Sequence, residues 1–306
     1  MFEFETEQKI HEIGSIRLGG QPGQLPTVMI GSMFHRGHGI VSDHGRGYFD
    51  EQKARHLIQQ QDNLSDQMGI PCMIDVFGET PTALGKYVEF VSEVTDAPFL
   101  LNAPTADARI QGTRAAGEMG LLDRMIYNSI NYTLNEQEIE SIKETGVKSA
   151  LIQSMNPRNT RLGGMKEIIK KDAENGLLAD SVRAGIEKPL LLAPVYDVPS
   201  MGLGLKGVHL LKSEFGLPTG IPPVGIIGTW DKIEGLGKDS KNVCRASALA
   251  LSQYSGSDFI IYGSIAKAPD LFPACAMVDI IVAYITKRAY GTKLLTENHP
   301  FYKVLR

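Results

Sequence analysis

The chain has 306 residues, of which 42% are apolar and 22% are charged, as is ordinary for a globular enzyme. Its net charge of −4 provides no basic field for nucleic acid or for an anionic membrane surface. Three cysteines, Cys72, Cys244 and Cys275, lie too far apart in the sequence for a metal knuckle or a redox pair.

The first residues, MFEFETEQKIHEIG, are acidic and lack the basic and then apolar order of a signal peptide. The longest apolar run, around residues 279–285, is interrupted by a charge and falls short of the ~20 apolar residues that a membrane helix needs. The sequence therefore predicts a cytoplasmic protein without a membrane segment.

Eight short runs, rich in β-branched or aromatic residues, follow one another along the chain. Their nearly continuous apolar character is typical of strands that are buried on both faces. They are Thr27–Phe34, Pro71–Gly78, Phe99–Pro104, Met125–Asn131, Lys148–Met155, Pro189–Asp197, Val224–Trp230 and Asp258–Ile265.

Helical patterns separate these runs. Asp50 is a candidate N-cap for the first helix and Gly146 a candidate C-cap for another. The predicted helices are Glu51–Met68, Thr82–Thr95, Asn135–Thr145, Lys241–Ser255 and Pro273–Tyr290.

Eight βα units in about 300 residues favour one closed (β/α)8 barrel over residues 1–306, with residues 1–25 as a leader packed on the barrel. An open α/β sheet is the alternative, but no G-x-G-x-x-G turn follows the first strand.

Polar side chains stand where the predicted strands end, which is where barrel enzymes carry their chemistry. These side chains are Asp75, Asn102, Asn128, Gln153 and Asp197, and Trp230 with Asp231 at the end of the seventh run.

This set of strand ends argues against several barrel chemistries. A Schiff-base aldolase needs a lysine at a strand's carboxyl end, whereas Lys148 and Lys188 precede their strands. A Mg²⁺-dependent enolisation site needs converging carboxylates, and strands three to five offer neutral amides. Amides flanked by carboxylates suit a heterocycle with alternating donors and acceptors, such as a pterin. For any one of these residues taken singly, the alternative is a structural role, in which its polar side chain ties neighbouring strands together.

The motifs IGSIRLGGQPGQLPTVMIGSMFHRGHGIV, MIDVFGE, FLLNAPTADARI, IYNSIN, SALIQSMNP and APVYDVPSMGLG occur in this order. Together they resemble the H subunit of tetrahydromethanopterin S-methyltransferase and the soluble bacterial relatives that serve corrinoid-dependent methylamine or betaine demethylation. The resemblance spans nearly the whole chain and implies a barrel of the pterin-binding methyltransferase type.

The resemblance implies methyl transfer between methylcobalamin on a corrinoid protein and N5 of a tetrahydropterin. By position, Asp75, Asn102, Asn128, Gln153 and Asp197 match pterin contacts, with Asp75, Asn102 and Asp197 as the catalytic candidates. The chain lacks the D-x-H-x-x-G signature of a cobalamin module, so the corrinoid is expected on a separate protein that docks over the barrel mouth. No strand end carries a histidine as an obvious acid for N5, and water is the expected proton carrier.

Further assignments stay open from the sequence. Arg158 and Arg161 suit the glutamate tail of a folate or an acidic partner, which weakly favours tetrahydrofolate over tetrahydromethanopterin, or they belong to a solvated loop. Trp230 contacts the ring or corrin, or caps the barrel. His35, His38 and His44 with Asp43 match no metal-site spacing, so no bound metal is expected.

The alternatives to a methyltransferase are a dihydropteroate synthase-like enzyme and a non-catalytic subunit that docks a corrinoid protein. The first needs a basic pyrophosphate site that the strand ends lack. The second predicts no pterin binding. A homodimer is expected from barrels of this group.

Overall fold

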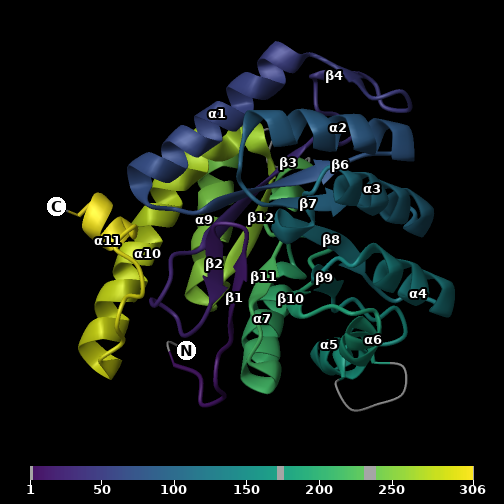
Figure 1. Ribbon diagram of the computed structural model, residues 1–306. Coiled ribbons are helices and arrows are strands. Elements are labelled where there is room, and N and C mark those ends of the chain that lie inside the picture. Colours follow the sequence, from purple (N-terminus) through teal and green to yellow (C-terminus); the bar gives the residue numbers. More distant parts are fainter. Residues whose placement is uncertain (1–2, 171–175, 231–238, 306) are drawn as a thin grey trace.

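A computed structural model describes residues 3–170, 176–230 and 239–305. Eight parallel strands close a barrel in the order β3, β6, β7, β8, β9, β10, β11 and β12, which returns to β3. This confirms the predicted closed barrel (Figure 1). The strands are β3 (Val28–Met33), β6 (Cys72–Phe77), β7 (Phe99–Asn102), β8 (Met125–Ile130), β9 (Ser149–Gln153), β10 (Lys188–Leu192), β11 (Thr219–Ile221) and β12 (Phe259–Ser264).

Helices surround the barrel and alternate with its strands (Figure 1). The Asp50 side chain accepts a hydrogen bond from the Lys53 amide, and Gly146 ends its helix in a left-handed conformation, as the sequence predicts. The helices are α1 (Glu51–Met68), α2 (Pro81–Val94), α3 (Ala106–Glu118), α4 (Glu136–Thr145), α5 (Leu162–Ile169), α6 (Leu177–Arg183), α7 (Met201–Phe215), α8 (Gly225–Gly228), α9 (Ser240–Tyr254), α10 (Ala268–Tyr290) and α11 (Pro300–Lys303).

The seventh strand is displaced from its predicted position. The prediction of Val224–Trp230 is wrong: β11 is Thr219–Ile221, and α8 begins at Gly225. Prolines 222 and 223 have no N–H and end the strand, while a short apolar run such as VGIIG does not distinguish a strand from a helical turn. Gly220 allows the close approach of β12, because a Cβ there would overlap the Phe259 ring.

The last long helix also departs from the prediction. It begins at Ala268 and includes Pro273 in its first turns, so the apolar segment is longer than the sequence predicts. Within the described residues, Ile265–Tyr290 is long and apolar enough to cross a membrane, with a mean hydropathy of 1.6. Half of this stretch is buried, and α10 packs against α9 and α1, as the core helix of a barrel does.

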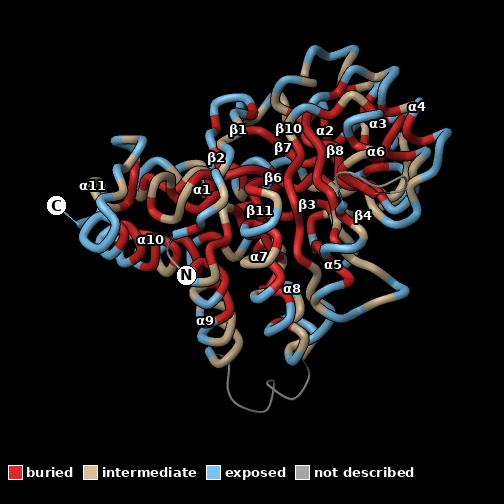
Figure 2. Tube along the Cα trace, turned by 90° about the horizontal axis from the view of Figure 1, so that it is seen from below, coloured by how far each residue is buried: buried red, intermediate tan, exposed pale blue. Residues whose placement is uncertain are grey.

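The N-terminal hairpin lies across one end of the barrel. It consists of β1 (Ile10–Ile13) and β2 (Ile16–Gly19). Ile13, Ile16 and Leu18 form one buried cluster with strand residues that include Val28 and Phe259. The Gly14 amide donates to the carbonyl oxygen of residue 123, just ahead of β8. The hairpin thus covers the amino-terminal ends of the strands, and the strands themselves are largely buried (Figure 2).

Candidate functional site

The alternation of side chains along each β-strand determines which polar residues face the barrel mouth. Met73, Leu100, Ile126 and Leu151 belong to the apolar cluster that fills the lower lumen. Successive side chains alternate between faces, so the residues two positions further on face the same lumen nearer its open end. These are Asp75, Asn102, Asn128 and Gln153.

Asp75 is the centre of this group. Its Oδ2 accepts a hydrogen bond from the Ser32 hydroxyl at 2.8 Å. Its Oδ1 accepts from Asn102 Nδ2 at 3.0 Å and from Asn128 Nδ2 at 3.2 Å. Asp75 and Asn128 are both 5% exposed. Burial raises the pKa of Asp75, and the hydrogen bonds from Ser32, Asn102 and Asn128 oppose this rise.

The cluster retains hydrogen-bonding capacity. A carboxylate has about four acceptor positions, and the described partners of Asp75 use three. The amide oxygens of Asn102 and Asn128 accept no hydrogen bond from the described residues. The mouth therefore presents a carboxylate together with free amide oxygens and N–H groups, a set that complements an amino-pyrimidine edge.

The other two predicted pterin contacts lie apart from this hydrogen-bonded cluster. Gln153 ends β9 and is half-buried. Asp197 is exposed in the loop after β10, where its Oδ1 accepts from the Ser200 amide at 2.8 Å. The hydrogen bonds from Ser200 lower the pKa of Asp197. The structure thus shows a local turn for Asp197 and no hydrogen bond to Asp75.

The proposed tail and partner contacts are on loops at the mouth side of the barrel. Arg158 and Arg161 are exposed after β9, and neither guanidinium has an ion-pair partner among residues 3–170, 176–230 and 239–305. Trp230 is half-buried just after α8, not at a strand end. Asp231 lies outside the described residues.

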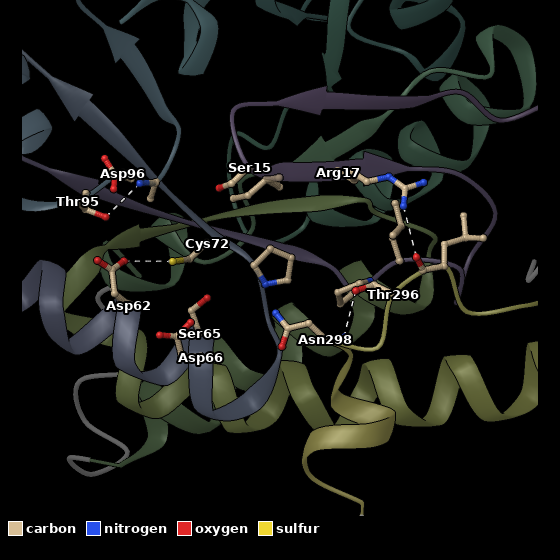
Figure 3. A pocket seen from close by; sticks show the side chains of 16 residues that line it. Ser15, Arg17, Asp62, Ser65, Asp66, Cys72, Thr95, Asp96, Thr296 and Asn298 are labelled. Atoms are coloured by element: carbon tan, nitrogen blue, oxygen red, sulfur yellow. Dashed lines mark hydrogen bonds between the residues drawn. The ribbon is translucent and has the colours of Figure 1, made fainter.

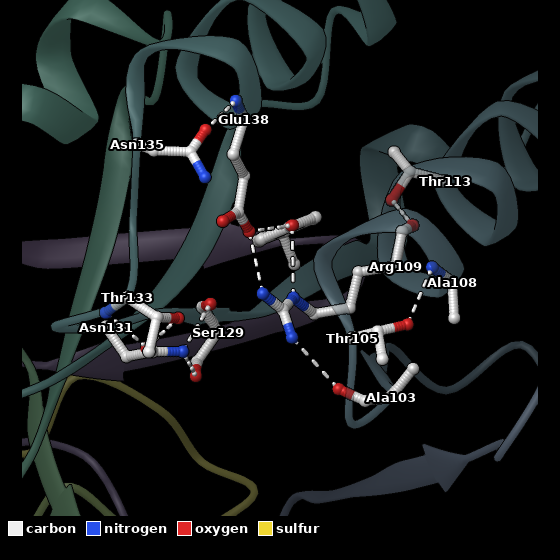
Figure 4. Close-up of polar contacts among 11 residues, drawn as sticks. Ala103, Thr105, Ala108, Arg109, Thr113, Ser129, Asn131, Thr133, Asn135 and Glu138 are labelled. Atoms are coloured by element: carbon white, nitrogen blue, oxygen red, sulfur yellow. Dashed lines mark hydrogen bonds and ion pairs between the residues drawn. The ribbon is translucent and has the colours of Figure 1, made fainter.

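A buried network behind the mouth, absent from the sequence prediction, ties two of the strand ends to their helices. Arg109 of α3 donates through Nη2 to Glu138 Oε1 at 2.7 Å and through Nη1 to the Ala103 carbonyl at 3.0 Å (Figure 4). The Tyr127 hydroxyl donates to the same Glu138 oxygen at 2.6 Å and accepts from Arg109 Nε at 3.1 Å. Ala103 follows Asn102, and Tyr127 precedes Asn128, so the network fixes the backbone next to both amides. Ser32 was also missed, although its position two residues after Ile30 on the first strand would have indicated it.

The histidines of the first loop do not gather around a metal position. In the described part of the chain, no three His, Cys, Asp or Glu side chains are arranged to hold an ion. His35 and His38 instead stack, with ring centroids 5.1 Å apart and planes 8° apart.

A cavity of about 450 Å³ lies at the opposite end of the barrel. Arg17 of the hairpin, Asp62 of α1 and Asp96 before β7 are among its lining residues (Figure 3). It opens at the amino ends of the strands, whereas catalytic groups of this fold stand at the carboxyl ends. The Asp75 cluster is therefore the candidate functional site.

Solved structures similar to this fold include dihydropteroate synthases. The enzyme from Yersinia pestis, solved with a pterine-sulfa conjugate, superimposes with a TM-score of 0.62 at 14% identity over 90% of this chain and 100% of that one. The Xanthomonas albilineans enzyme gives a TM-score of 0.59 at 13% identity, over 92% of this chain and 98% of that one. At these identities the likeness establishes the barrel fold alone.

Sequence comparisons are more specific. The H subunit of tetrahydromethanopterin S-methyltransferase from Methanothermobacter thermautotrophicus is 38% identical over the full length of both chains. The H subunit of the putative methyltransferase mtx from Methanosarcina barkeri is 36% identical, over 92% of this chain and 94% of its own. The family described as tetrahydromethanopterin S-methyltransferase MtrH subunit matches residues 6–294. The chain therefore belongs to the MtrH family of methyltransferase subunits.

Proposed function

We propose that this protein transfers a methyl group between methylcobalamin, carried by a separate corrinoid protein, and N5 of a tetrahydropterin bound in the barrel mouth. The observation that carries the proposal is the Asp75 carboxylate, which is buried at the open end of the lumen and held by Ser32, Asn102 and Asn128. No lysine or arginine donates to this carboxylate among the described residues, so it remains available to a neutral ligand with N–H donors.

The chemical fit is specific to the amino-pyrimidine edge. The ring N–H and the exocyclic amine of a pterin are both donors, and Asp75 offers an acceptor position beyond those used inside the protein. The amide oxygens of Asn102 and Asn128, and the N–H bonds not used on Asp75, can form hydrogen bonds with the ring nitrogens and the carbonyl. Gln153 faces the same lumen by strand alternation, and Asp197 is assigned to the rim of the pterin site through the loop after β10.

The residues at the mouth position two reactants rather than supply a covalent group. N5 of a neutral tetrahydropterin attacks the methyl carbon, the cobalt–carbon bond breaks with its electron pair left on cobalt, and N5 loses its proton. Holding N5 in line with the methyl group and excluding water accounts for a large part of such a rate enhancement.

We favour tetrahydrofolate over tetrahydromethanopterin because Arg158 and Arg161 are exposed beside the mouth and have no ion-pair partner among the described residues. Two guanidinium groups suit the carboxylates of a glutamate tail. Trp230 is assigned to contact with the ring or with the corrin of the docking protein. The relatives named for tetrahydromethanopterin make both pterins necessary in the test.

We also propose a cytoplasmic homodimer. The outer face of α10 exposes Met277, Ile281 and Tyr284 at helical spacing, and α9 exposes Leu251 and Tyr254 beside it. A second copy of this chain would cover these apolar side chains. Light scattering of the wild type and Ile281→Glu tests this, with a dimer expected only for the wild type.

The test of the main proposal is a spectrophotometric assay of Co(I) formation with the purified chain, methylcobalamin on a corrinoid protein, and either pterin. Activity that Asp75→Asn abolishes while the fold persists supports the proposal. Pterin binding without transfer supports a role in docking alone, and dependence on pyrophosphate esters supports the dihydropteroate synthase-like alternative.

A further inference from the structure

Two histidines in the loop after β3 each have one ring nitrogen that no described residue contacts by a hydrogen bond. His35 Nδ1 lies 2.8 Å from the Arg36 carbonyl oxygen. A carbonyl only accepts, so the proton is on Nδ1 and Nε2 of the neutral ring has a lone pair. His38 Nδ1 accepts from the Phe34 amide at 3.1 Å, so the proton of His38 is on Nε2. Both Nε2 atoms are buried and have no hydrogen-bond partner in residues 3–170, 176–230 and 239–305.

This pair stands next to the candidate site. His35 follows the last residue of β3 by two positions, and the Asp75 carboxyl interacts electrostatically with it. The ring of His35 is half-buried, whereas His38 is 7% exposed. A buried ring nitrogen with a free lone pair can accept a proton or a hydrogen bond, so His35 Nε2 has accepting capacity that the described residues do not use.

Of the two rings, His38 is poorly suited to take up a proton. Burial, together with the neighbouring His35, lowers the pKa of His38 to about 4. The other charged groups of the loop are engaged elsewhere, since Arg36 pairs with Glu79 at 2.5 Å and His44 interacts with that same glutamate. Arg46 pairs with Asp43 in the same way, so a charge on His35 would interact with the Asp75 carboxylate while the arginines of this loop pair with other carboxylates.

We propose that His35 accepts the N5 proton during methyl transfer and that His38 is a positioning residue, which holds the His35 ring by stacking. The inference rests on the proposed function. As the bond between N5 and the methyl carbon forms, the cobalt–carbon electron pair stays on cobalt, and the N5 proton moves to Nε2 of His35. In the reverse direction the imidazolium returns this proton to N5.

The test compares His35→Gln with His56→Gln, a control at an exposed position of α1. Pterin Kd, and kcat with the corrinoid protein as a function of pH, are measured for each. We expect His35→Gln to keep the pterin Kd within threefold and to lose about 10²–10⁴-fold in kcat. General-base catalysis predicts that the wild-type kcat toward the methylated pterin rises with pH and that this rise is absent in the variant. Imidazole added to His35→Ala restores part of the rate.

The outcomes separate the two ideas. An active wild type with an unchanged kcat and pH profile in His35→Gln overturns the role of His35 and leaves the proposed function intact. A loss of kcat that parallels a loss of pterin affinity, without rescue by imidazole, also overturns it in favour of a binding role. A wild type that neither binds a pterin nor transfers methyl overturns both.

Discussion

Replacing Asp75 by alanine and by asparagine should have opposite effects on stability and the same effect on function. Alanine leaves three donors, on Ser32, Asn102 and Asn128, without their acceptor. At about 1–3 kcal/mol for each unpaired buried group, the loss is roughly 3–9 kcal/mol. We expect the lower end, because Asn102 is half-buried and water can reach it. Even this is a large share of the ~5–15 kcal/mol that stabilises a typical domain.

Asparagine keeps one oxygen in the position that both amides contact, and the Ser32 hydroxyl can rotate to accept from the new amide group. Burial raises the pKa of Asp75, so the native state binds a proton more tightly than the unfolded chain. The wild type therefore gains stability relative to Asp75→Asn as the pH falls through this raised pKa. At neutral pH we expect the asparagine variant to be as stable as the wild type or more so.

Urea unfolding at pH 7 and pterin titration of both variants measure these effects. Pterin affinity should fall in each, by about 10–150-fold if one charge-assisted hydrogen bond of about 1.5–3 kcal/mol is lost. If the free energies of unfolding of the alanine and asparagine variants differ by less than about 0.5 kcal/mol, the expected cost of leaving three donors without an acceptor is refuted. Unchanged pterin affinity in Asp75→Asn would refute the placement of the ligand.

Three further substitutions test the buried polar groups outside this cluster. Tyr127→Phe removes the hydroxyl that Glu138 accepts from at 2.6 Å and should cost about 1–3 kcal/mol in urea unfolding; a loss below about 0.5 kcal/mol would contradict this. Lys212→Met leaves Asp258 buried without its 2.6 Å ion pair and should cost about 3–5 kcal/mol in urea unfolding. Adding Asp258→Asn to this variant should restore part of the lost stability, and a double variant that is no more stable than Lys212→Met would contradict the reasoning. Burial raises the pKa of Asp279 to about 6, so between pH 7 and pH 4 the wild type should gain up to roughly 3 kcal/mol relative to Asp279→Asn; parallel stability curves for the two proteins would count against it.

The sequence predicts the barrel and three members of the cluster because both follow from local rules. Apolar runs identify seven of the eight strands, and the open end of a barrel collects whatever polar residues end those strands. Asp75, Asn102 and Asn128 each stand two positions after a lumen-facing apolar residue, which is a periodic signal. β11 escaped detection because its three residues lie between prolines and include a glycine, so it carries little β-propensity.

Contacts between side chains distant in the sequence were not predictable in the same way. Arg109 and Glu138 belong to different helices, and each alone resembles a solvent-exposed helix residue. The electrostatic proximity of His35 to Asp75 depends on how the chain leaves β3. Asp197 is the opposite case. Its position near a strand end predicts a pterin contact, whereas in the structure its carboxylate accepts a hydrogen bond from the Ser200 amide within a local turn. Strand position fixes where a residue stands, but the partners of its side chain follow from tertiary packing.

A comparison of the buried carboxylates explains why the mouth is the place for a ligand. Asp258, next to the covered end of the barrel, has its counter-charge in Lys212 at 2.6 Å. Asp279 packs against the chain entering β3. Its two carboxylate oxygens accept three hydrogen bonds from Thr27 and Gln253. Asp75 is equally buried, yet it faces the open end, has no cationic partner in hydrogen-bond range among the described residues, and is held by amides whose own oxygens are free. Such an arrangement costs folding free energy, because burial disfavours the carboxylate charge. A ligand that donates hydrogen bonds to Asp75 would offset that cost, and the amide oxygens of Asn102 and Asn128, which accept nothing from the described residues, could bind the same ligand.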